Sequence, residues 1–285
     1  MFLLLALSAP AFAGGLTLRR ISTGTFDGNY ADLVQGGEKR TVQIPIPVYV
    51  IPHRQGVVLF DSGLGSEFEQ QSQGSWLNRL FRRLLPHHLA NGETAVEQLK
   101  RFRIEPERVK AIVLSHLHFD HAGGLRDFPN AMVYVNRAEL ASATGSPWLA
   151  RLRGVMTEQL AGVKFRPVEY RTGTSFGPFE ASYDLFGDGS LLLLSTPGHT
   201  PGHQSLLVTV GSGKQVLLTG DAVWVTANYE KPSPKGWKPR LLEEEDKIAW
   251  KTTLAIRKFH EEHPEILIIP GHDPDLWGKL PEILE

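Results

Sequence analysis

Cysteine is absent from this chain of 285 residues. Its absence excludes disulfide bonds and every metal site that is built on thiolates, including iron–sulfur clusters. Any bound metal ion would therefore have nitrogen and oxygen ligands, a set that suits zinc, manganese, cobalt or iron.

Neither sign of charge is in excess. The chain has 30 Lys and Arg residues and 31 Asp and Glu residues, which gives a formal net charge of −1. This balance indicates no nucleic-acid partner, because such a partner favours a basic domain. With 41% apolar residues, the chain is long enough to bury a sizeable core in one layered domain.

The apolar stretch at the amino terminus, MFLLLALSAPAFA, is too short to cross a bilayer, which needs ~20 apolar residues. We therefore expect no stable membrane insertion. The stretch ends in Ala11-Phe12-Ala13, which is typical of a signal-peptide cleavage site. We predict a signal peptide over residues 1–13, a single domain over residues 14–285, and a periplasmic or secreted protein. Because the stretch has no Lys or Arg, two alternatives stay open: a start further upstream, or a buried N-terminal strand.

Hydrophobic periodicity predicts alternating strands and helices. Residues 42–50 and 57–60 read as a β-hairpin, and helical spacing predicts helices over residues 71–89, 93–103 and 243–263. We expect the helix over residues 71–89 to pack on the domain, with a lid, a homodimer contact or a membrane-surface helix as alternatives. The acidic run Glu243–Asp246 is interpreted as a solvated cap at the start of the third helix.

Four apolar runs lead directly into a histidine or an aspartate. Residues 111–115, 191–194, 215–218 and 266–269 precede, within a few residues, His116, His199, Asp221 and His272. Such runs are typical of buried strands, and functional side chains of α/β folds collect on the loops where strands end. We therefore expect these four loops to converge along one edge of the sheets.

The densest of these loops reads His116-Leu117-His118-Phe119-Asp120-His121. Four ligand-type side chains within six residues cannot share one face of a strand or a helix, but a tight loop can turn them toward two neighbouring ions. His116 and His118 would serve one ion, and Asp120 with His121 the second.

The remaining histidines are interpreted as ordinary residues. His87 and His88 would follow a helix, and His260 and His263 fit a helix C-terminus, where positive charge is favourable. We expect His203, four residues after His199, to lie in a loop or to support the site from behind, without binding metal itself.

The strings HLHFDHAGG, TPGHTPGH, TGDA and PGHDP, in this order, resemble the metallo-beta-lactamase superfamily from about Val42 to the C-terminus. The resemblance implies an α+β fold, an αββα sandwich of two mixed sheets packed face to face with helices outside. It implies two divalent metal ions, most simply zinc, with manganese, cobalt or iron as alternatives. The implied ligands are His116, His118 and His199 for one ion, Asp120, His121 and His272 for the other, and Asp221 as the bridge. Asp61, in the FDSG turn, would orient the site without binding metal.

Within the superfamily, the chain most resembles the N-acyl homoserine lactonase group, through IPIPVY before the FDSG turn and PGHDP with Trp277 nearby. This resemblance implies a small-molecule hydrolase that opens a lactone or a related ester by attack of a hydroxide held between the metals. Asp120 would be the catalytic proton shuttle. Phosphotriesterase, thioesterase and beta-lactamase-like activities, or an iron-dependent oxidation, are alternatives on the same ligand set.

One position departs from that group. Trp224 stands three residues after Asp221, where these lactonases often have a tyrosine, and an indole donates a hydrogen bond but cannot act as a phenol. Tyr229 is not expected to replace it. Phe119 and Trp224 are predicted walls of the substrate pocket, with a purely structural role in the core as the alternative.

Overall fold

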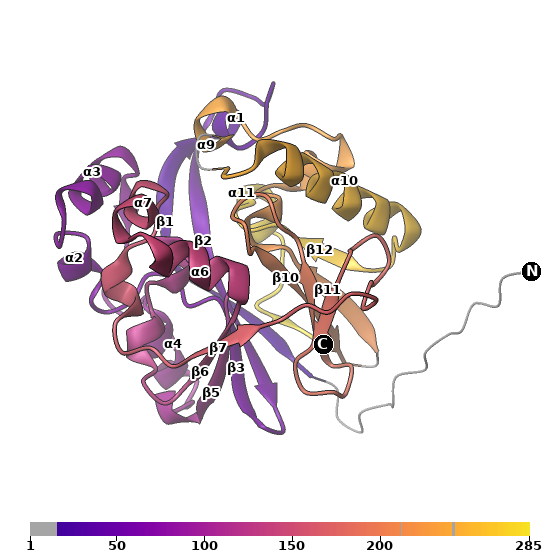
Figure 1. Cartoon of the computed structure of the whole chain (residues 1–285), viewed down its shortest axis with the longest axis horizontal. Coiled ribbons are helices and arrows are strands. Elements are labelled where there is room, and N and C mark those ends of the chain that lie inside the picture. The colour runs from indigo at the N-terminus through magenta and orange to yellow at the C-terminus, as the bar shows by residue number, and fades with distance from the viewer. Residues whose placement is uncertain (1–15, 212, 241–242) are drawn as a thin grey trace, which may run out of the picture.

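Two β-sheets form the centre of the molecule, and helices cover their outer faces (Figure 1). The computed structural model describes residues 16–211, 213–240 and 243–285. The signal peptide predicted over residues 1–13 lies outside the described residues and stays a prediction.

The first sheet has the strand order β13-β1-β2-β3-β5-β6-β7, with β4 paired to β1. Its strands are β1 (Leu18–Asn29), β2 (Thr41–His53), β3 (Gly56–Phe60), β4 (His87–His88), β5 (Val109–Val113), β6 (Met132–Asn136), β7 (Phe165–Val168) and β13 (Ile283–Leu284). The antiparallel pair β2 and β3 is the predicted hairpin. Strand β3 is parallel to β5, so the chain leaves both strands at the same edge of the sheet.

The second sheet has the order β12-β11-β10-β9-β8. Its strands are β8 (Ser182–Asp184), β9 (Leu191–Ser195), β10 (Gln204–Val210), β11 (Lys214–Leu218) and β12 (Leu267–Ile269). β10 is antiparallel to both β9 and β11, and β11 is parallel to β12. Strands β9, β11 and β12 therefore also end at one common edge.

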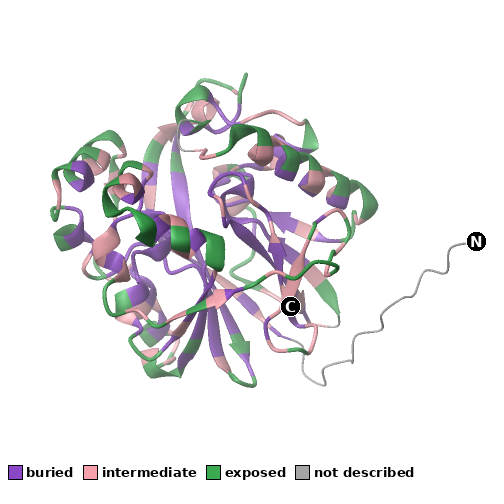
Figure 2. Cartoon of the chain, viewed as in Figure 1, coloured by how far each residue is buried: buried purple, intermediate pink, exposed green. Residues whose placement is uncertain are grey.

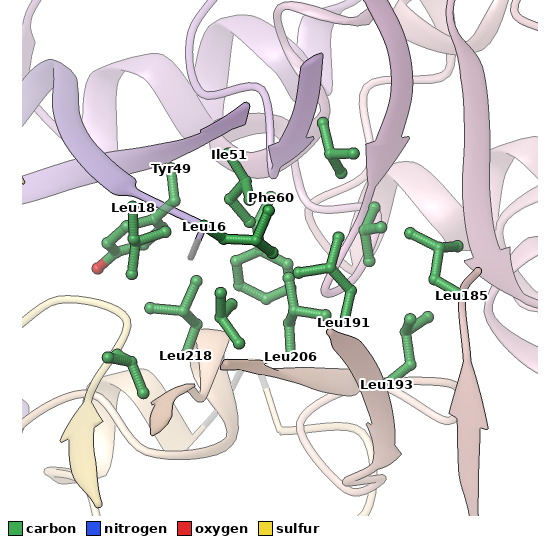
Figure 3. Close-up of a cluster of buried hydrophobic side chains, with 14 of the residues drawn as sticks. Leu16, Leu18, Tyr49, Ile51, Phe60, Leu185, Leu191, Leu193, Leu206 and Leu218 are labelled. Carbon is green, nitrogen blue, oxygen red and sulfur yellow. The ribbon is translucent and has the colours of Figure 1, made fainter. Parts of the chain in front are cut away.

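The main core lies between the sheets (Figure 3). Ile51 and Phe60 of the first sheet lie in the same fully buried cluster as Leu191, Leu206 and Leu218 of the second. Truncating one such side chain to alanine costs about 2–5 kcal/mol of stability, because a cavity remains. This interlayer core fixes the two sheets relative to one another.

Helices complete the outer layers, as the buried strands and the more exposed helices in Figure 2 show. They are α1 (Tyr30–Leu33), α2 (Phe68–Gln71), α3 (Trp76–Leu84), α4 (Ala95–Arg101), α5 (Phe119–Ala122), α6 (Arg137–Gly145), α7 (Pro147–Leu152), α8 (Thr226–Glu230), α9 (Trp237–Arg240), α10 (Asp246–Glu262) and α11 (Pro274–Trp277). Leu99 of α4 packs on the outer face of the first sheet, and Phe259 of α10 packs on that of the second. The expected αββα sandwich is confirmed.

Two predicted helices differ in extent. Residues 71–89 do not form one helix, because Ser75 caps a new helix by accepting a hydrogen bond from the Asn78 N–H at 3.0 Å, and the chain leaves α3 before Pro86. The helix predicted from residue 243 begins only at Asp246. The helix predicted over residues 93–103 is α4, whose cap Thr94 forms a capping box with Glu97.

None of the helices in the described part of the chain combines the length and the apolar character that crossing a bilayer requires.

Candidate metal centre

The strand-end loops of both sheets bring their polar side chains to one place. β5 leads to His116, β9 to His199, β12 to His272, and β11 to a short turn, Gly220–Ala222, that holds Asp221. His118 directly precedes α5, whose first turn holds Asp120 and His121. The seven side chains predicted as metal ligands are all buried and lie together.

Potential ligand atoms form three overlapping groups within the described residues. Each group has its atoms within 4.8 Å of one another: His116, His118 and His199; His116, His121 and Asp221; and Asp120, His121 and His272. The first and third groups are the two ligand sets that the family resemblance implies. His203 belongs to none of the three.

Asp221 lies between the first and third groups. Its Oδ2 is 3.4 Å from His199 Nε2, and its Oδ1 is 3.3 Å from His121 Nε2 and 3.1 Å from His272 Nε2. One carboxylate therefore faces both sets of ligands with different oxygen atoms, which is the placement that a bridging ligand needs.

The spacing of these atoms fits metal ions. A tetrahedral ion with bonds of 2.0–2.1 Å to nitrogen or oxygen separates neighbouring ligand atoms by roughly 3.3 Å. His118 Nδ1 and His199 Nε2 are 3.1 Å apart, and Asp120 Oδ2 is 3.4 Å from His121 Nε2. In addition, Nε2 of His116 is buried and has no hydrogen-bond partner within the described chain. Buried polar atoms are rarely left unpaired, so this atom indicates a bound ion.

The charges of the cluster are divided between its two halves. Burial, together with the neighbouring His199, lowers the pKa of His118 to about 3, and burial also lowers the pKa of His116 well below its usual value. Both rings are therefore neutral, the form that binds metal. Burial opposes charge on His121 and His272 as well, but Asp120 and Asp221 outweigh it and raise the pKa of both imidazoles.

Asp61 supports two of the histidines from behind. Its Oδ2 lies 2.8 Å from His121 Nδ1 and accepts a hydrogen bond from the Ser115 hydroxyl at 2.9 Å, and that hydroxyl also contacts His116 Nδ1 at 2.9 Å. Asp61 has a φ of 60°, a left-handed conformation that costs a non-glycine residue about 1–3 kcal/mol. Its contacts fix the orientation of both rings, as expected of a residue that positions metal ligands.

Glu243 is a residue that the sequence reasoning misplaced. It is not part of a solvated cap: its side chain is buried, and its Oε1 lies 3.2 Å from His199 Nδ1. Lys235, also buried, forms an ion pair with Glu243 and donates a hydrogen bond to the Asp221 carbonyl at 2.6 Å. Burial opposes ionisation of Glu243, but Lys235 and His199 lower its pKa to about 2. The only sequence signal was that an acidic run lay beside a lysine-containing loop, which is too common to single out this pair.

A second buried carboxylate links two of the loops. Glu139 of α6 accepts hydrogen bonds from the Leu117 N–H at 2.9 Å and from the Gly202 N–H at 3.1 Å. Leu117 lies between two of the histidines, and Gly202 follows His199 by three residues. Burial raises the pKa of Glu139 to about 7. Glu139 therefore fixes the backbone of both loops without touching a ligand.

His203 and Tyr229 occupy structural positions. His203 is fully buried, and its Nδ1 contacts the Thr196 hydroxyl at 2.9 Å, with its ring 5.3 Å from that of His116. Tyr229 packs in the core beneath α10, away from the pocket, so it does not take the place of Trp224.

A cavity of about 490 Å³ opens directly above the cluster. His118, Asp120, Asp221 and His272 form its base, and apolar residues such as Phe26, Ile44, Phe81 and Leu85 form its walls. Phe119 and Trp224 both line it, and Phe119 also packs in the core against Phe26. Trp224 Nε1 is itself buried and has no hydrogen-bond partner within the described chain.

A serine nucleophile has no support in this structure. Gly173-Thr174-Ser175-Phe176-Gly177 matches the spacing of a serine-hydrolase nucleophile motif, but it lies in the loop between β7 and β8. That motif requires a sharp turn from a strand into a helix.

Known proteins share this arrangement. The family model described as the metallo-beta-lactamase superfamily matches residues 42–272. The chain belongs to the metallo-beta-lactamase superfamily. Such membership makes it a metal-dependent hydrolase with a site for two metal ions, as the sequence predicted.

Relatives within the superfamily are similar over most of their length. N-acyl homoserine lactonase AttM of Rhizobium radiobacter is 32% identical over 252 residues, which cover 86% of this chain and 89% of the relative. An N-acyl homoserine lactonase of a Bacillus species is 32% identical over 193 residues, covering 68% and 70%. A solved N-acyl homoserine lactone hydrolase, with N-hexanoyl-L-homoserine at its catalytic metal centre, superposes with a TM-score of 0.75 at 23% identity, covering 94% of this chain and 97% of that one. This last likeness concerns the fold.

Proposed function

We propose that this protein hydrolyses the lactone ring of N-acyl homoserine lactones. The observation that carries the proposal is a cluster for two metal ions at the base of a deep pocket with mainly apolar walls. Such a pocket suits a substrate that combines a polar reacting ring with an apolar acyl chain. Lactonase relatives that match two thirds of the chain or more support the same substrate class.

We assign His116, His118 and His199 to one ion, and Asp120, His121 and His272 to the other, with Asp221 shared by both. Zinc is the ion we propose, because the ligands are nitrogen and oxygen atoms at tetrahedral spacing. Metal analysis of protein purified without added metal tests this assignment, and a stoichiometric content of iron or manganese would contradict it.

When bound, two such ions would lower the pKa of a water molecule toward 7 and would polarise the lactone carbonyl. The reaction adds water to that carbonyl carbon and breaks its bond to the ring oxygen. The products are a carboxylate, a free hydroxyl group and one proton that is released to solvent. The protein must therefore orient the ring, exclude competing solvent and deliver one proton to the departing oxygen.

Asp120 is placed to move that proton. Its carboxylate lines the pocket, and Oδ2 lies 3.4 Å from His121 Nε2 and 3.5 Å from His272 Nε2. Burial alone would raise the pKa of Asp120, but the positive charge beside it outweighs burial and lowers that pKa. The carboxylate is therefore ionised at neutral pH, and its oxygen that does not face the two histidines can accept a proton before passing it to the leaving oxygen.

Trp224 is placed to orient the substrate. Its indole ring lies edge-on to His272 with ring centres 5.4 Å apart, and its N–H has no partner in the described chain. Because Nε1 is buried, a rotation of the indole on substrate binding would present this donor to a carbonyl oxygen of the substrate. The indole would thus supply the hydrogen bond that a tyrosine hydroxyl supplies elsewhere, without acting as an acid.

The test is a substrate panel with metal-loaded protein, containing acyl homoserine lactones, a phosphotriester, a thioester and a chromogenic beta-lactam. We expect lactone opening, and we expect Asp120→Asn to reduce its rate about 100-fold or more while both metal ions remain bound. The matched control is Asp246→Asn, since Asp246 is exposed and, within the described residues, its ion pair is with Arg240. Cleavage of another substrate in the panel, with no lactone opened, would refute the proposed substrate.

A further inference from the structure

Exposed large apolar side chains are concentrated on α3, α7 and α9. Trp76, Leu80 and Leu84 of α3, Trp148 and Leu152 of α7, and Trp237 of α9 are between 42% and 69% exposed. They are six of the eight large hydrophobic residues that are exposed in the described part of the chain. Single exposed apolar residues are ordinary, whereas a concentration of this kind marks a surface that contacts something.

These helices lie next to the pocket. α3 contacts α7, and Gly154, just after α7, lines the pocket. Leu84 of α3 and Lys238 of α9 also line it, although Leu84 is largely exposed. The exposed apolar residues and the opening of the pocket therefore belong to one region of the surface, the docking face, which we define as the exposed side of α3, α7 and α9.

The helices of this face carry basic but no acidic side chains, and carboxylates of neighbouring elements pair with four of the basic ones: Arg82 with Glu69, Arg151 with Glu158, Lys238 with Asp32 and Arg240 with Asp246. The three helices read WLNRLFRRL, PWLARL and WKPR, and they contain six Lys and Arg residues but no Asp or Glu. The whole chain, in contrast, has 30 basic and 31 acidic residues. Arg79 and Arg83 are exposed beside Leu80 and form no ion pair within the described residues. Tryptophan, leucine and arginine thus share this face with no carboxylate on its helices.

We propose that the docking face binds an anionic lipid surface, with the mouth of the pocket turned toward the lipid. Tryptophan and leucine insert at the boundary between headgroups and acyl chains, and arginine is attracted to anionic headgroups. The helices have 9, 6 and 4 residues, far shorter than the ~20 that cross a bilayer. The association is therefore peripheral and reversible.

A second copy of the chain fits this face less well. In a symmetric dimer the same surface lies on both sides of the interface, so Arg79 and Arg83 of each copy would approach the cations of the other. Like charges that are brought together out of water repel, and no carboxylate on these helices would compensate them. An anionic lipid surface supplies charge of opposite sign to Arg79 and Arg83, which form no ion pair within the described residues.

This orientation has a consequence for the pocket, which rests on the function proposed above. A substrate with an acyl chain partitions into lipid, so a mouth in contact with the bilayer could receive it without passage through water. Binding to lipid itself requires no substrate, and it can be measured even if lactones are not the substrate.

The experiment is co-sedimentation of the metal-loaded full-length protein with vesicles. We expect binding to vesicles of phosphatidylcholine and phosphatidylglycerol in equal parts, weak binding to pure phosphatidylcholine, and loss of binding at high salt. Arg79→Gln with Arg83→Gln should weaken binding roughly fivefold for each arginine removed. Trp76→Ser with Leu80→Ser should weaken it about tenfold.

Matched controls remove the same chemistry elsewhere. Arg108→Gln with Lys110→Gln removes two exposed cations from the start of β5, the end of the strand opposite His116, and Leu254→Ser removes an exposed leucine of α10. Neither should change vesicle binding. The substituted side chains of the docking face are exposed and do not line the pocket, so melting temperature and metal content should stay as in the wild type.

Either of two results would overturn the proposal. One is the absence of binding to anionic vesicles, or binding that the docking-face variants leave unchanged. The other is a dimer in light scattering that Trp76→Ser with Leu80→Ser converts to a monomer, since the face would then be an interface between copies of the chain.

Discussion

Glu243 and Lys235 connect two of the proposed metal ligands, His199 and Asp221. Glu243 contacts His199 Nδ1. Its ion-pair partner Lys235 donates a hydrogen bond to the backbone carbonyl of Asp221. In the chain, Lys235 precedes Trp237 by two residues. A carboxylate on the far nitrogen of a histidine fixes the ring and makes it a better metal ligand. The ion pair is buried, so removal of one partner leaves the other charge uncompensated.

We expect Glu243→Gln to weaken metal binding by about 10- to 100-fold, because glutamine accepts a hydrogen bond from His199 but carries no charge. Competition against a chromogenic chelator measures the affinity. Glu245→Gln is the matched control, because Glu245 is exposed two residues further on. Equal affinities in the two variants would show that Glu243 contributes only to folding.

The unpaired N–H of Trp224 makes a separate prediction. Trp224→Phe keeps an aromatic wall but removes the donor, and a neutral hydrogen bond is worth about 0.5–1.5 kcal/mol. We therefore expect kcat/KM for a short-chain lactone to fall roughly 2- to 12-fold. Trp224→Tyr should recover part of the loss, whereas Trp250→Phe, on α10 outside the pocket, should change nothing. A phenylalanine variant as active as the wild type would mean that the indole N–H does not meet the substrate.

At the scale of elements, α6 acts on both ligand loops through Glu139. Its pKa is raised to about 7, so between about pH 4.5 and 7 the folded protein holds a proton that the unfolded chain has released. The contribution of Glu139 to the free energy of unfolding is therefore fully present below about pH 4.5. This contribution decreases as pH rises from about 4.5 through 7, and the total loss is up to about 3 kcal/mol.

Urea unfolding of the wild type and Glu139→Gln at several pH values tests this sign. We expect the stability of the wild type relative to the variant to decrease from about pH 5 to about pH 8. Comparison at each pH removes the titration of all other groups that the two proteins share. A difference that is constant, or that grows with pH, would contradict the raised pKa.

The sequence predicted the elements that carry strong local patterns. Continuous apolar strands ending in His116, His199, Asp221 and His272 were visible because burial on both faces leaves runs without polar interruption. β1 was not predicted, since its sequence LRRISTGTFDGN is partly exposed and its register with β2 shifts between Ser22 and Thr25. Its place in the sheet depends on pairing with β2, the next strand, and with β13 at the far end of the chain.

Contacts between distant segments explain the other errors. Glu243 resembles its exposed neighbours in sequence, and only the packing of residues 243–245 against Gly198 and His199 buries it. Likewise, the helical spacing of Gln71 to Leu89 suggested one packed helix, yet Trp76, Leu80 and Leu84 face outward. Local periodicity identifies an apolar stripe but not whether another layer covers it.

At the scale of the whole molecule, the metal centre joins the two sheets. His116, His118, Asp120 and His121 follow a strand of the first sheet, whereas His199, Asp221 and His272 follow strands of the second. Bound ions therefore add to the interlayer core as a connection between the sheets. Ligands that bind only the folded state stabilise it by mass action, by about 2.7 kcal/mol at 100 times Kd.

We expect chelation to lower the melting temperature by several degrees and to abolish hydrolysis, and zinc to restore both.

Zinc binding at about pH 7 should also release protons, because Asp120 and Asp221 raise the pKa of His121 and His272 and these protons must leave before metal binds. Affinity for zinc should accordingly decrease as pH falls. Titration in weakly buffered solution measures the released protons, and uptake of zinc without release would contradict this account.

Most of the entrance of the pocket and the proposed metal ligands belong to different parts of the chain, although Phe119 and Trp224 lie in the ligand loops. The ligands follow the central strands, whereas α3, α9 and the end of β1, which shape the entrance, supply none of them. Mutations at the entrance can therefore accumulate while the reactive centre stays intact. In evolutionary terms, proteins with this architecture can change their substrate specificity with little effect on the catalytic reaction. New substrates are therefore expected to arise first from mutations in those peripheral segments.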